Sequence, residues 1–274
     1  MSQPIILNLK TVLQMLPTRT PESHKGSYGK VLAVCGSSPY RGAAVLSVMG
    51  ALRTGAGLVT LAAPECVVAA AAARVPEAIF LPDAAQERIL EEVSRSEVCL
   101  LGCGLSADAD TAQLAKKALD ASMGVVVLDA GALCSLADDI SAITAFAQSQ
   151  PLIVTPHPGE MARLCRCSVE DIEKERTSCA LDFALSTGAI TVLKGHETLI
   201  ACPDGTLYEN LTGNAGLARG GSGDILAGMI AGLAAQGMSA EHAAAAGVFL
   251  HGLSADRCAA RLSMQGMLPS DILT

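Results

Sequence analysis

One glycine-rich segment, residues 212–228 (TGNAGLARGGSGDILAG), holds the residue types best suited to chemistry. Apolar residues recur at helical spacing after Asp224, which predicts a helix that starts between Gly221 and Asp224. The unpaired N–H groups at such a helix start, with the positive end of the helix dipole, bind phosphate oxygens. A carboxylate would repel phosphate, so Asp224 is better suited to accept a proton from an attacking hydroxyl group or to hold a metal ion.

A simpler interpretation treats this segment as an ordinary helix start, in which the aspartate only complements the helix dipole. The length and glycine density of residues 212–228 favour the binding loop instead. The segment is not a Walker A loop, because no Gly-Lys-Ser/Thr follows it, and it lacks the Rossmann fingerprint, because it ends in Gly-Asp late in the chain.

Further polar and glycine-rich segments follow five apolar runs that predict buried strands. Ligands bind at the carboxyl ends of the strands in open parallel sheets, so these segments and the 212–224 loop predict one long cleft along that edge. The segments are Gly36-Ser-Ser38, Gly102-Cys-Gly104, Asp129-Ala-Gly131, Thr155-Pro-His-Pro-Gly-Glu160 and Lys194-Gly-His-Glu-Thr198.

Three side chains in these segments each leave two interpretations open, and a fourth calls for a partner. His157 is held between two prolines, as a ligand-binding residue or as a solvated loop residue. Glu160 is either part of the site or only the first-turn acid of a helix that follows. Asp129 is either a site residue or a helix N-cap. Lys194 ends a buried strand, where a cation needs an anionic partner, and phosphate is a reasonable one.

The elements that must position these residues alternate between strands and helices. Apolar runs predict strands at 31–35, 58–62, 78–81, 98–101, 125–128, 152–154 and 190–193, and a hairpin at 198–208. Helices are expected at 41–54, 65–74, 84–95, 108–122, 168–187, 223–236 and 240–260, with a short one within 7–16. This pattern predicts a single α/β domain over residues 1–274, whose mostly parallel sheet is covered on both faces.

The composition excludes several classes of protein. The net charge of −8, without a cluster of Lys or Arg, argues against a nucleic-acid surface. The ten cysteines are scattered and form no CxxC pair, so reduced cysteines in a cytoplasmic protein are expected. His24, His196, His242 and His251 lack zinc-ligand spacing. Neither a signal peptide nor a membrane span is expected, because the apolar run 225–240 is shorter than the roughly 20 residues that a span needs.

Taken together, six motifs resemble those of the ADP-dependent NAD(P)H-hydrate dehydratases, which belong to the ribokinase-like superfamily. The resemblance extends from about residue 24 to residue 260. The motifs are Lys30–Ser37, Tyr40–Ala44, Arg53–Thr60, Thr155–Glu160, Lys194-Gly195 and Gly220–Asp224.

This resemblance implies a three-layer α/β/α sandwich and a particular reaction. The family converts the S-epimer of hydrated NADH or NADPH back to the intact cofactor, coupled to hydrolysis of ADP in bacterial members and of ATP in eukaryotic ones. By analogy with the superfamily kinases, the hydroxyl group is phosphorylated and phosphate then leaves. A magnesium ion bridging the nucleotide phosphates is expected, and Glu160 is the first candidate for its protein ligand.

The resemblance also implies a form of the protein and its partners. The chain is too short for the epimerase domain that bifunctional members carry in front, so we expect the stand-alone dehydratase, working with a separate NAD(P)H-hydrate epimerase. Family members form homotetramers, which Ala-rich helices would suit.

Site residues are carried over by motif position. Asp224 would be the catalytic base. The damaged dinucleotide would contact Ala43, Gly104, His157 and Asp224. The adenine nucleotide would contact Lys194, Gly195, His196, Glu197, Thr198 and Gly223, and the loop would be lined by Asn214, Gly221 and Ser222.

The chain departs from the family pattern at three positions. Gly131 replaces an expected aspartate, which removes a polar contact from the segment after the central strand. Ala215 replaces a common proline and gives the loop more backbone freedom. Arg219 replaces a small hydroxyl residue and either adds a phosphate contact or is exposed.

Two other functions use the same glycine loop. One is a superfamily kinase for a hydroxymethylpyrimidine or thiazole vitamin precursor, which would leave a stable phosphorylated product. The other is a nucleotide-binding module without catalysis, which would bind nucleotide without turnover. The Thr155–Glu160 segment favours the dehydratase.

Overall fold

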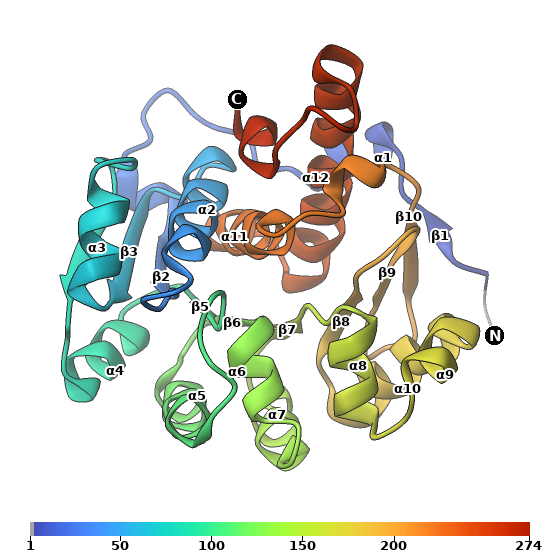
Figure 1. Cartoon of the computed structure of the whole chain (residues 1–274), viewed down its shortest axis with the longest axis horizontal. Helices are drawn as coiled ribbons and strands as arrows, with labels where there is room; N and C mark the ends of the chain where they lie inside the picture. The colour runs from blue at the N-terminus through green and yellow to red at the C-terminus, as the bar shows by residue number, and fades with distance from the viewer. Residues whose placement is uncertain (1–2) are drawn as a thin grey trace.

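The computed structural model describes residues 3–274, which fold around one ten-stranded sheet between two layers of helices (Figure 1). The strand order is β1-β10-β9-β8-β7-β6-β5-β2-β3-β4. The strands are β1 (Ile5–Ile6), β2 (Lys30–Val34), β3 (Leu58–Ala63), β4 (Ile79–Pro82), β5 (Val98–Leu101), β6 (Val125–Leu128), β7 (Leu152–Val154), β8 (Ile190–Leu193), β9 (Thr198–Ala201) and β10 (Leu207–Asn210).

Across the sheet, seven consecutive strands pair in parallel, in the order β8-β7-β6-β5-β2-β3-β4. Strand β9 is antiparallel to both of its neighbours, β8 and β10. Continuous apolar runs form the central strands; every residue of Val98–Leu101 is buried. Such runs suit strands that are covered on both faces. The predicted strands and the hairpin at 198–208 are confirmed, whereas the short strand β1 beside β10 was not predicted.

Two hydrophobic clusters, one on each face of the sheet, define the layers. One face is covered by α1 (Leu9–Met15), α2 (Arg41–Arg53), α3 (Glu65–Ala72), α11 (Ser222–Ala235) and α12 (Ala240–Leu262). The other face is covered by α4 (Gln86–Ser94), α5 (Ala109–Ala121), α6 (Ala130–Ser135), α7 (Ile140–Ala147), α8 (Pro158–Cys165), α9 (Val169–Lys174) and α10 (Arg176–Thr187). The predicted α/β/α sandwich is confirmed.

The helix predictions differ from the structure in three places, one of which is α8, raised only as one interpretation of Glu160. The long helix expected at 168–187 is divided into α9 and α10, because Glu175 leaves the helical region with φ −124° and ψ 37°. No helix was predicted between 130 and 147, where α6 and α7 form. Both are short, so too few residues repeat there to produce a helical period.

Helices α2 and α11 pack backbone against backbone through three glycines. A Cβ atom on Gly228 would overlap the carbonyl oxygen of Ser47, and one on Gly50 would lie 2.6 Å from the carbonyl oxygen of Ile225. A Cβ atom on Gly232 would overlap the carbonyl oxygen of Ala51. This close packing fixes the axis of α11, whose first turn carries Asp224. None of the described helices is long and apolar enough to cross a membrane.

Candidate active site

The carboxyl ends of β2 and β5 are joined by hydrogen bonds, two of which are short. The Gly36 N–H donates to the carbonyl oxygen of Cys103 at 2.7 Å, and the Ser37 hydroxyl donates to the carbonyl oxygen of Gly104 at 2.7 Å. Gly104 has a φ of 71°, and a Cβ atom on it would lie 2.7 Å from the Cβ of Ala43. Two residues predicted to contact the dinucleotide, Ala43 and Gly104, therefore lie side by side.

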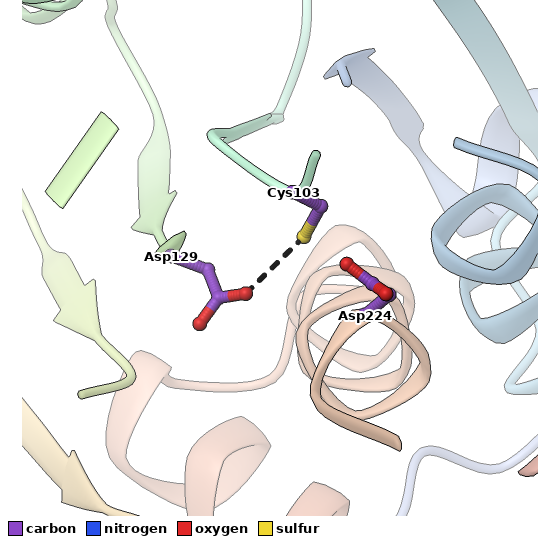
Figure 2. A group of neighbouring side chains, drawn as sticks. All are labelled: Cys103, Asp129 and Asp224. Carbon is purple, nitrogen blue, oxygen red and sulfur yellow. Dashed lines mark hydrogen bonds between the residues drawn. The ribbon is translucent and has the colours of Figure 1, made fainter. Parts of the chain in front are cut away.

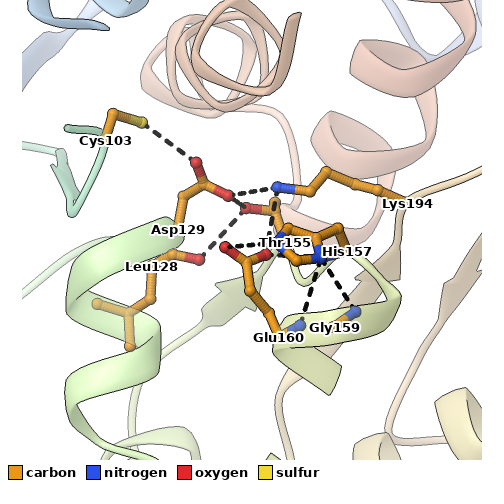
Figure 3. Close-up of polar contacts among 8 residues, drawn as sticks. All are labelled: Cys103, Leu128, Asp129, Thr155, His157, Gly159, Glu160 and Lys194. Carbon is orange, nitrogen blue, oxygen red and sulfur yellow. Dashed lines mark hydrogen bonds and ion pairs between the residues drawn. The ribbon is translucent and has the colours of Figure 1, made fainter. Parts of the chain in front are cut away.

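Asp129, at the end of β6, is the centre of a buried polar network (Figure 3). Its Oδ1 accepts hydrogen bonds from Lys194 Nζ and from the Thr155 hydroxyl, each at 2.7 Å. Its Oδ2 accepts a hydrogen bond from the Cys103 thiol at 3.4 Å. Asp129 precedes α6 at the N-cap position, but its side chain does not cap that helix. Asp129 therefore occupies the N-cap position without a side-chain capping hydrogen bond, and its role in a site stays a prediction.

Lys194, at the end of β8, lies between two carboxylates. Its Nζ is 2.7 Å from Asp129 Oδ1 and 3.6 Å from Glu160 Oε2. Burial lowers the pKa of Lys194, but the two carboxylates raise it more, so the pKa is above its usual value and the side chain stays charged. The protein itself thus supplies the anionic partner that a buried cation needs, for which phosphate was one reasonable prediction.

His157 and Glu160 form a reciprocal cap at the start of α8 (Figure 3). His157 Nδ1 accepts hydrogen bonds from the N–H groups of Gly159 and Glu160, at 3.0 and 3.3 Å. Glu160 Oε2 accepts from the N–H of His157 at 2.7 Å. Because Nδ1 is an acceptor, a neutral His157 carries its proton on Nε2. Glu160 is both a first-turn acid and a partner of Lys194, so its two interpretations are not exclusive.

Asp224 lies in the first turn of α11, as the glycine-rich segment predicted. Its carboxylate, the Asp129 carboxylate and the Cys103 thiol each place an atom within 4.8 Å of the others (Figure 2). Burial, and then the charge of Asp129, raise the pKa of Asp224 to about 6. A Cβ atom on Gly223 would lie 3.4 Å from Lys194 Nζ, so the ammonium group lies beside the start of α11. The glycine loop and the Asp129 network therefore belong to one site.

The comparison with known proteins gives the family. The sequence profile described as NAD(P)H-hydrate dehydratase matches residues 31–274. The chain belongs to the NAD(P)H-hydrate dehydratase family. It is 38% identical over 244 residues to the ADP-dependent (S)-NAD(P)H-hydrate dehydratase of Bacillus subtilis, covering 88% of this chain and 85% of that one. It is 42% identical over 268 residues to the bifunctional NAD(P)H-hydrate repair enzyme of Moorella thermoacetica, covering 94% of this chain but 50% of that one.

Solved structures agree with this membership. The chain resembles the ADP/ATP-dependent dehydratase of B. subtilis co-crystallised with ATP/Mg²⁺, with a TM-score of 0.84 at 33% identity, covering 98% of this chain and 96% of that one. A hydroxyethylthiazole kinase from Pyrococcus horikoshii matches with a TM-score of 0.59 at 12% identity, which shows a shared fold alone. The chain spans about half the length of the bifunctional relatives it matches. The resemblance to a ribokinase-like dehydratase is confirmed.

Not every residue carried over from the family joins the central network. Gly195, His196 and Glu197 lie in the turn between β8 and β9, and Thr198 is the first residue of β9. The His196 side chain is 92% exposed. Thr198 donates its hydroxyl to the carbonyl oxygen of Gly195 at 2.9 Å. Of the Lys194–Thr198 segment, only Lys194 reaches the carboxylates, so contact of the other four with a nucleotide stays a prediction.

The protein donors in this site suit Mg²⁺ poorly. Magnesium prefers oxygen ligands in octahedral geometry. A hydrogen bond with Cys35 and burial raise the pKa of Cys103 well above its usual value, so this soft ligand stays protonated. Lys194 already occupies one oxygen of Asp129. Glu160 Oε2 already accepts the His157 N–H and lies near the Lys194 ammonium group, so Glu160 is poorly placed to bind a metal ion. We therefore assign no protein ligand to magnesium.

The family departures have structural counterparts. A Cβ atom on Gly131 would overlap the carbonyl oxygen of Leu105, so any larger residue there requires the 105–106 loop to move. Arg219 is exposed, as one of its two interpretations predicted, and it donates to the carbonyl oxygen of Gln265 at 2.5 Å.

Sequence reasoning missed three residues around the site. Arg176 donates from Nη2 to the carbonyl oxygens of Leu193 and Lys194, at 3.2 and 3.4 Å. His251 is buried, and its Nε2 has no hydrogen-bond partner among the described residues. Asp256 binds the glycine loop from α12. Each lies on a helix without a local motif, so only the fold reveals its position.

Proposed function

We propose that this chain dehydrates the S-epimer of hydrated NADH or NADPH to the intact cofactor, coupled to conversion of ADP to AMP and phosphate. The observation that carries the proposal is the position of Asp224. Its carboxylate lies in the first turn of α11, which follows the glycine-rich loop, and close to Lys194, which is bound by Asp129. Family membership supports the identity of the substrates.

The reaction has two parts that balance. Asp224 accepts the proton of the C6 hydroxyl as that oxygen attacks the β-phosphorus of ADP, and the bond to AMP breaks. The C6 carbon–oxygen bond then breaks, the nitrogen lone pair of the ring supplies the electrons, and phosphate leaves. Loss of a proton from the adjacent ring carbon to the departing phosphate or to water then completes the carbon–carbon double bond of the intact cofactor. Hydroxide is a poor leaving group and phosphate is a good one, which explains why the dehydration consumes a nucleotide.

Positive charge and backbone N–H groups stabilise the transferring phosphoryl group in this scheme. Lys194 stays protonated, and its carboxylate partners hold its Nζ beside Gly223. The N–H groups of Gly221, Ser222 and Gly223 are at the start of α11, where the helix dipole favours negative charge. Loss of one such donor typically lowers the rate on the order of 100-fold or more.

The hydrated dinucleotide would contact Ala43, Gly104 and His157. Gly104 and Ala43 are both half-buried and lie against each other, so one ligand group could contact both. The side chain of His157 is 56% exposed, and its Nε2, which lies 3.5 Å from Glu160 Oε1, would donate to an oxygen of the dinucleotide. The adenine nucleotide would contact the segment from Gly195 to Thr198, which leads from the turn into β9.

Three further features complete the proposal. Magnesium would be held chiefly by the nucleotide phosphates and would neutralise their charge. The S-epimer would be supplied by a separate NAD(P)H-hydrate epimerase. The relatives of about twice this length are named bifunctional repair enzymes, without naming the epimerase. We also propose a cytoplasmic homotetramer, in which the ten free cysteines stay reduced.

Product stoichiometry tests the reaction. Purified protein with hydrated NADH, ADP and magnesium should release AMP, phosphate and NADH in equal amounts, with no phosphorylated dinucleotide accumulating. Replacing ADP by ATP should give ADP and phosphate if both donors serve. A stable phosphorylated product would instead indicate a kinase, and nucleotide binding without any product would indicate a binding module.

A further inference from the structure

Asp256, on α12, reaches across to the beginning of the glycine-rich loop. Its Oδ2 accepts a hydrogen bond from the N–H of Gly213 at 2.9 Å. Its Oδ1 accepts one from Asn214 Nδ2 at 3.0 Å. Among the ion pairs of the described chain, none involves Asp256, so N–H donors of the loop are its observed partners.

These contacts continue as a chain of hydrogen bonds to the first turn of α11. Asn214 Oδ1 accepts from the N–H of Gly216 at 2.9 Å, which starts the short helix η2 (Ala215–Leu217). The Leu217 carbonyl oxygen accepts from the Ser222 hydroxyl at 2.7 Å. Ser222 is the first residue of α11, two residues before Asp224.

The loop also rests directly on α12 at its first residue. The Thr212 hydroxyl donates to the carbonyl oxygen of Phe249 at 3.0 Å. A Cβ atom on Gly252 would overlap Thr212, so loop and helix touch at backbone distance. One turn further along α12, Asp256 fixes the next two residues of the loop.

We propose that Asp256 is a positioning residue for phosphoryl transfer, because it orients Asn214 and through it the first turn of α11. This inference rests on the proposed function. Glycine at 213 and 221, with φ of 106° and 103°, gives the loop wide backbone freedom. A displacement of about 1 Å in reacting groups can lower a rate about 100-fold. With asparagine at 214, position 256 requires a carboxylate, since the Gly213 N–H and Asn214 Nδ2 both donate to it.

Exchanging the two side chains tests this inference. In Asp256→Asn, the new amide has only one acceptor oxygen, so its NH₂ group faces either the Gly213 N–H or Asn214 Nδ2, and one hydrogen bond is lost. In Asn214→Asp, two carboxylates face each other. In the double variant, the new amide oxygen at 256 accepts from Gly213, and its NH₂ group donates to the new carboxylate at 214, which still accepts from Gly216. Every hydrogen bond of the native arrangement is then restored with its direction at one contact reversed.

We expect each single variant to lower kcat by at least about tenfold while KM for ADP changes less than about threefold, because orientation is lost and binding surface is kept. The double variant should recover kcat to within about threefold of the wild type. Asp182→Asn is the matched control, since it removes one charge from an exposed position on α10 and should leave both constants unchanged.

Amide hydrogen exchange of residues 213–224 gives a readout that does not depend on turnover. Exchange should accelerate in both single variants and return to the wild-type rate in the double variant. A folded double variant with the low kcat of the single variants would contradict the proposal. So would losses of kcat that match the unfolded fraction at the assay temperature. If the wild-type protein lacks dehydratase activity, the proposed function is wrong. The contact between Asp256 and the loop is still supported in that case if exchange is faster in the single variants and normal in the double variant.

Discussion

Lys194 Nζ lies 2.7 Å from Asp129 Oδ1, although the two residues are 65 positions apart in the chain. The pair joins the ends of β8 and β6 across the intervening strand β7. Glu160, at the start of α8, is the second carboxylate beside this lysine. The lysine therefore keeps its charge and a fixed position beside the glycine loop before any nucleotide binds.

Asp129→Asn should destabilise the protein, because it removes the nearer carboxylate from a mostly buried ammonium group. Breaking one partner of a buried pair typically costs about 3–5 kcal/mol in the free energy of unfolding. The double variant Asp129→Asn with Lys194→Met removes both charges and should be more stable than Asp129→Asn alone. Urea unfolding measures the free energy of unfolding of the two variants. Equal values for the single and the double variant would argue against energetic coupling between Asp129 and Lys194.

His157→Asn separates the two roles of that residue. Asparagine accepts hydrogen bonds at a helix N-cap, so α8 should keep its cap and the free energy of unfolding should change by less than about 1 kcal/mol. The variant lacks the Nε2–H, and so KM for the hydrated dinucleotide should rise at least about tenfold while KM for ADP stays near the wild-type value. Equal increases in both KM values would refute the assignment of His157 to the dinucleotide.

Gly228→Ala tests the contact between α2 and α11. The new Cβ atom would overlap the Ser47 carbonyl oxygen, so the helices must separate at a cost of about 1–3 kcal/mol in the free energy of unfolding. Gly42→Ala is the control on α2, because a Cβ atom there meets no atom within 4 Å and alanine favours the helix. Thermal unfolding should show a lower Tm for Gly228→Ala and an equal or higher Tm for Gly42→Ala.

His251 should make the folded protein sensitive to acid. Burial lowers the pKa of His251 from 6.5 to about 4. Above pH 6.5 the ring is neutral in both states; as the pH falls toward 4, the unfolded chain binds a proton that the folded protein does not. At pH 5 this difference corresponds to about 2 kcal/mol of lost stability.

His251→Leu checks that account. Its free energy of unfolding, measured in urea at pH 7.5 and pH 5, should fall less between the two values than that of the wild type. The same decline in both proteins would show that other groups cause the acid sensitivity.

Local patterns predicted most of the elements, for physical reasons. Val98–Leu101 and Ile190–Leu193 are apolar runs that only a sheet covered on both faces can bury throughout. The start of α11 was predictable because glycines precede a clear helical period. The division at Glu175 was not, because the apolar pattern continues on both sides of it.

Site residues were predictable where a short motif contained them. Asp224 and the Thr155–Glu160 segment are examples. The partner of Lys194 was not, since Asp129 becomes its neighbour only when β6, β7 and β8 align. The role of Asp256 was not predictable for the same reason. It lies within α12, and its partner Asn214 is 42 residues earlier in the chain.

The most direct measurement of the central claim compares wild type with Asp224→Asn in hydrated NADH, ADP and magnesium, following absorbance at 340 nm. We predict that wild-type protein gives a rise that depends on ADP, and that Asp224→Asn lowers kcat at least about 100-fold while it still binds ADP. Turnover in Asp224→Asn equal to that of the wild type would contradict the assignment of Asp224 as the base. No rise with the folded wild-type protein would contradict the dehydratase itself.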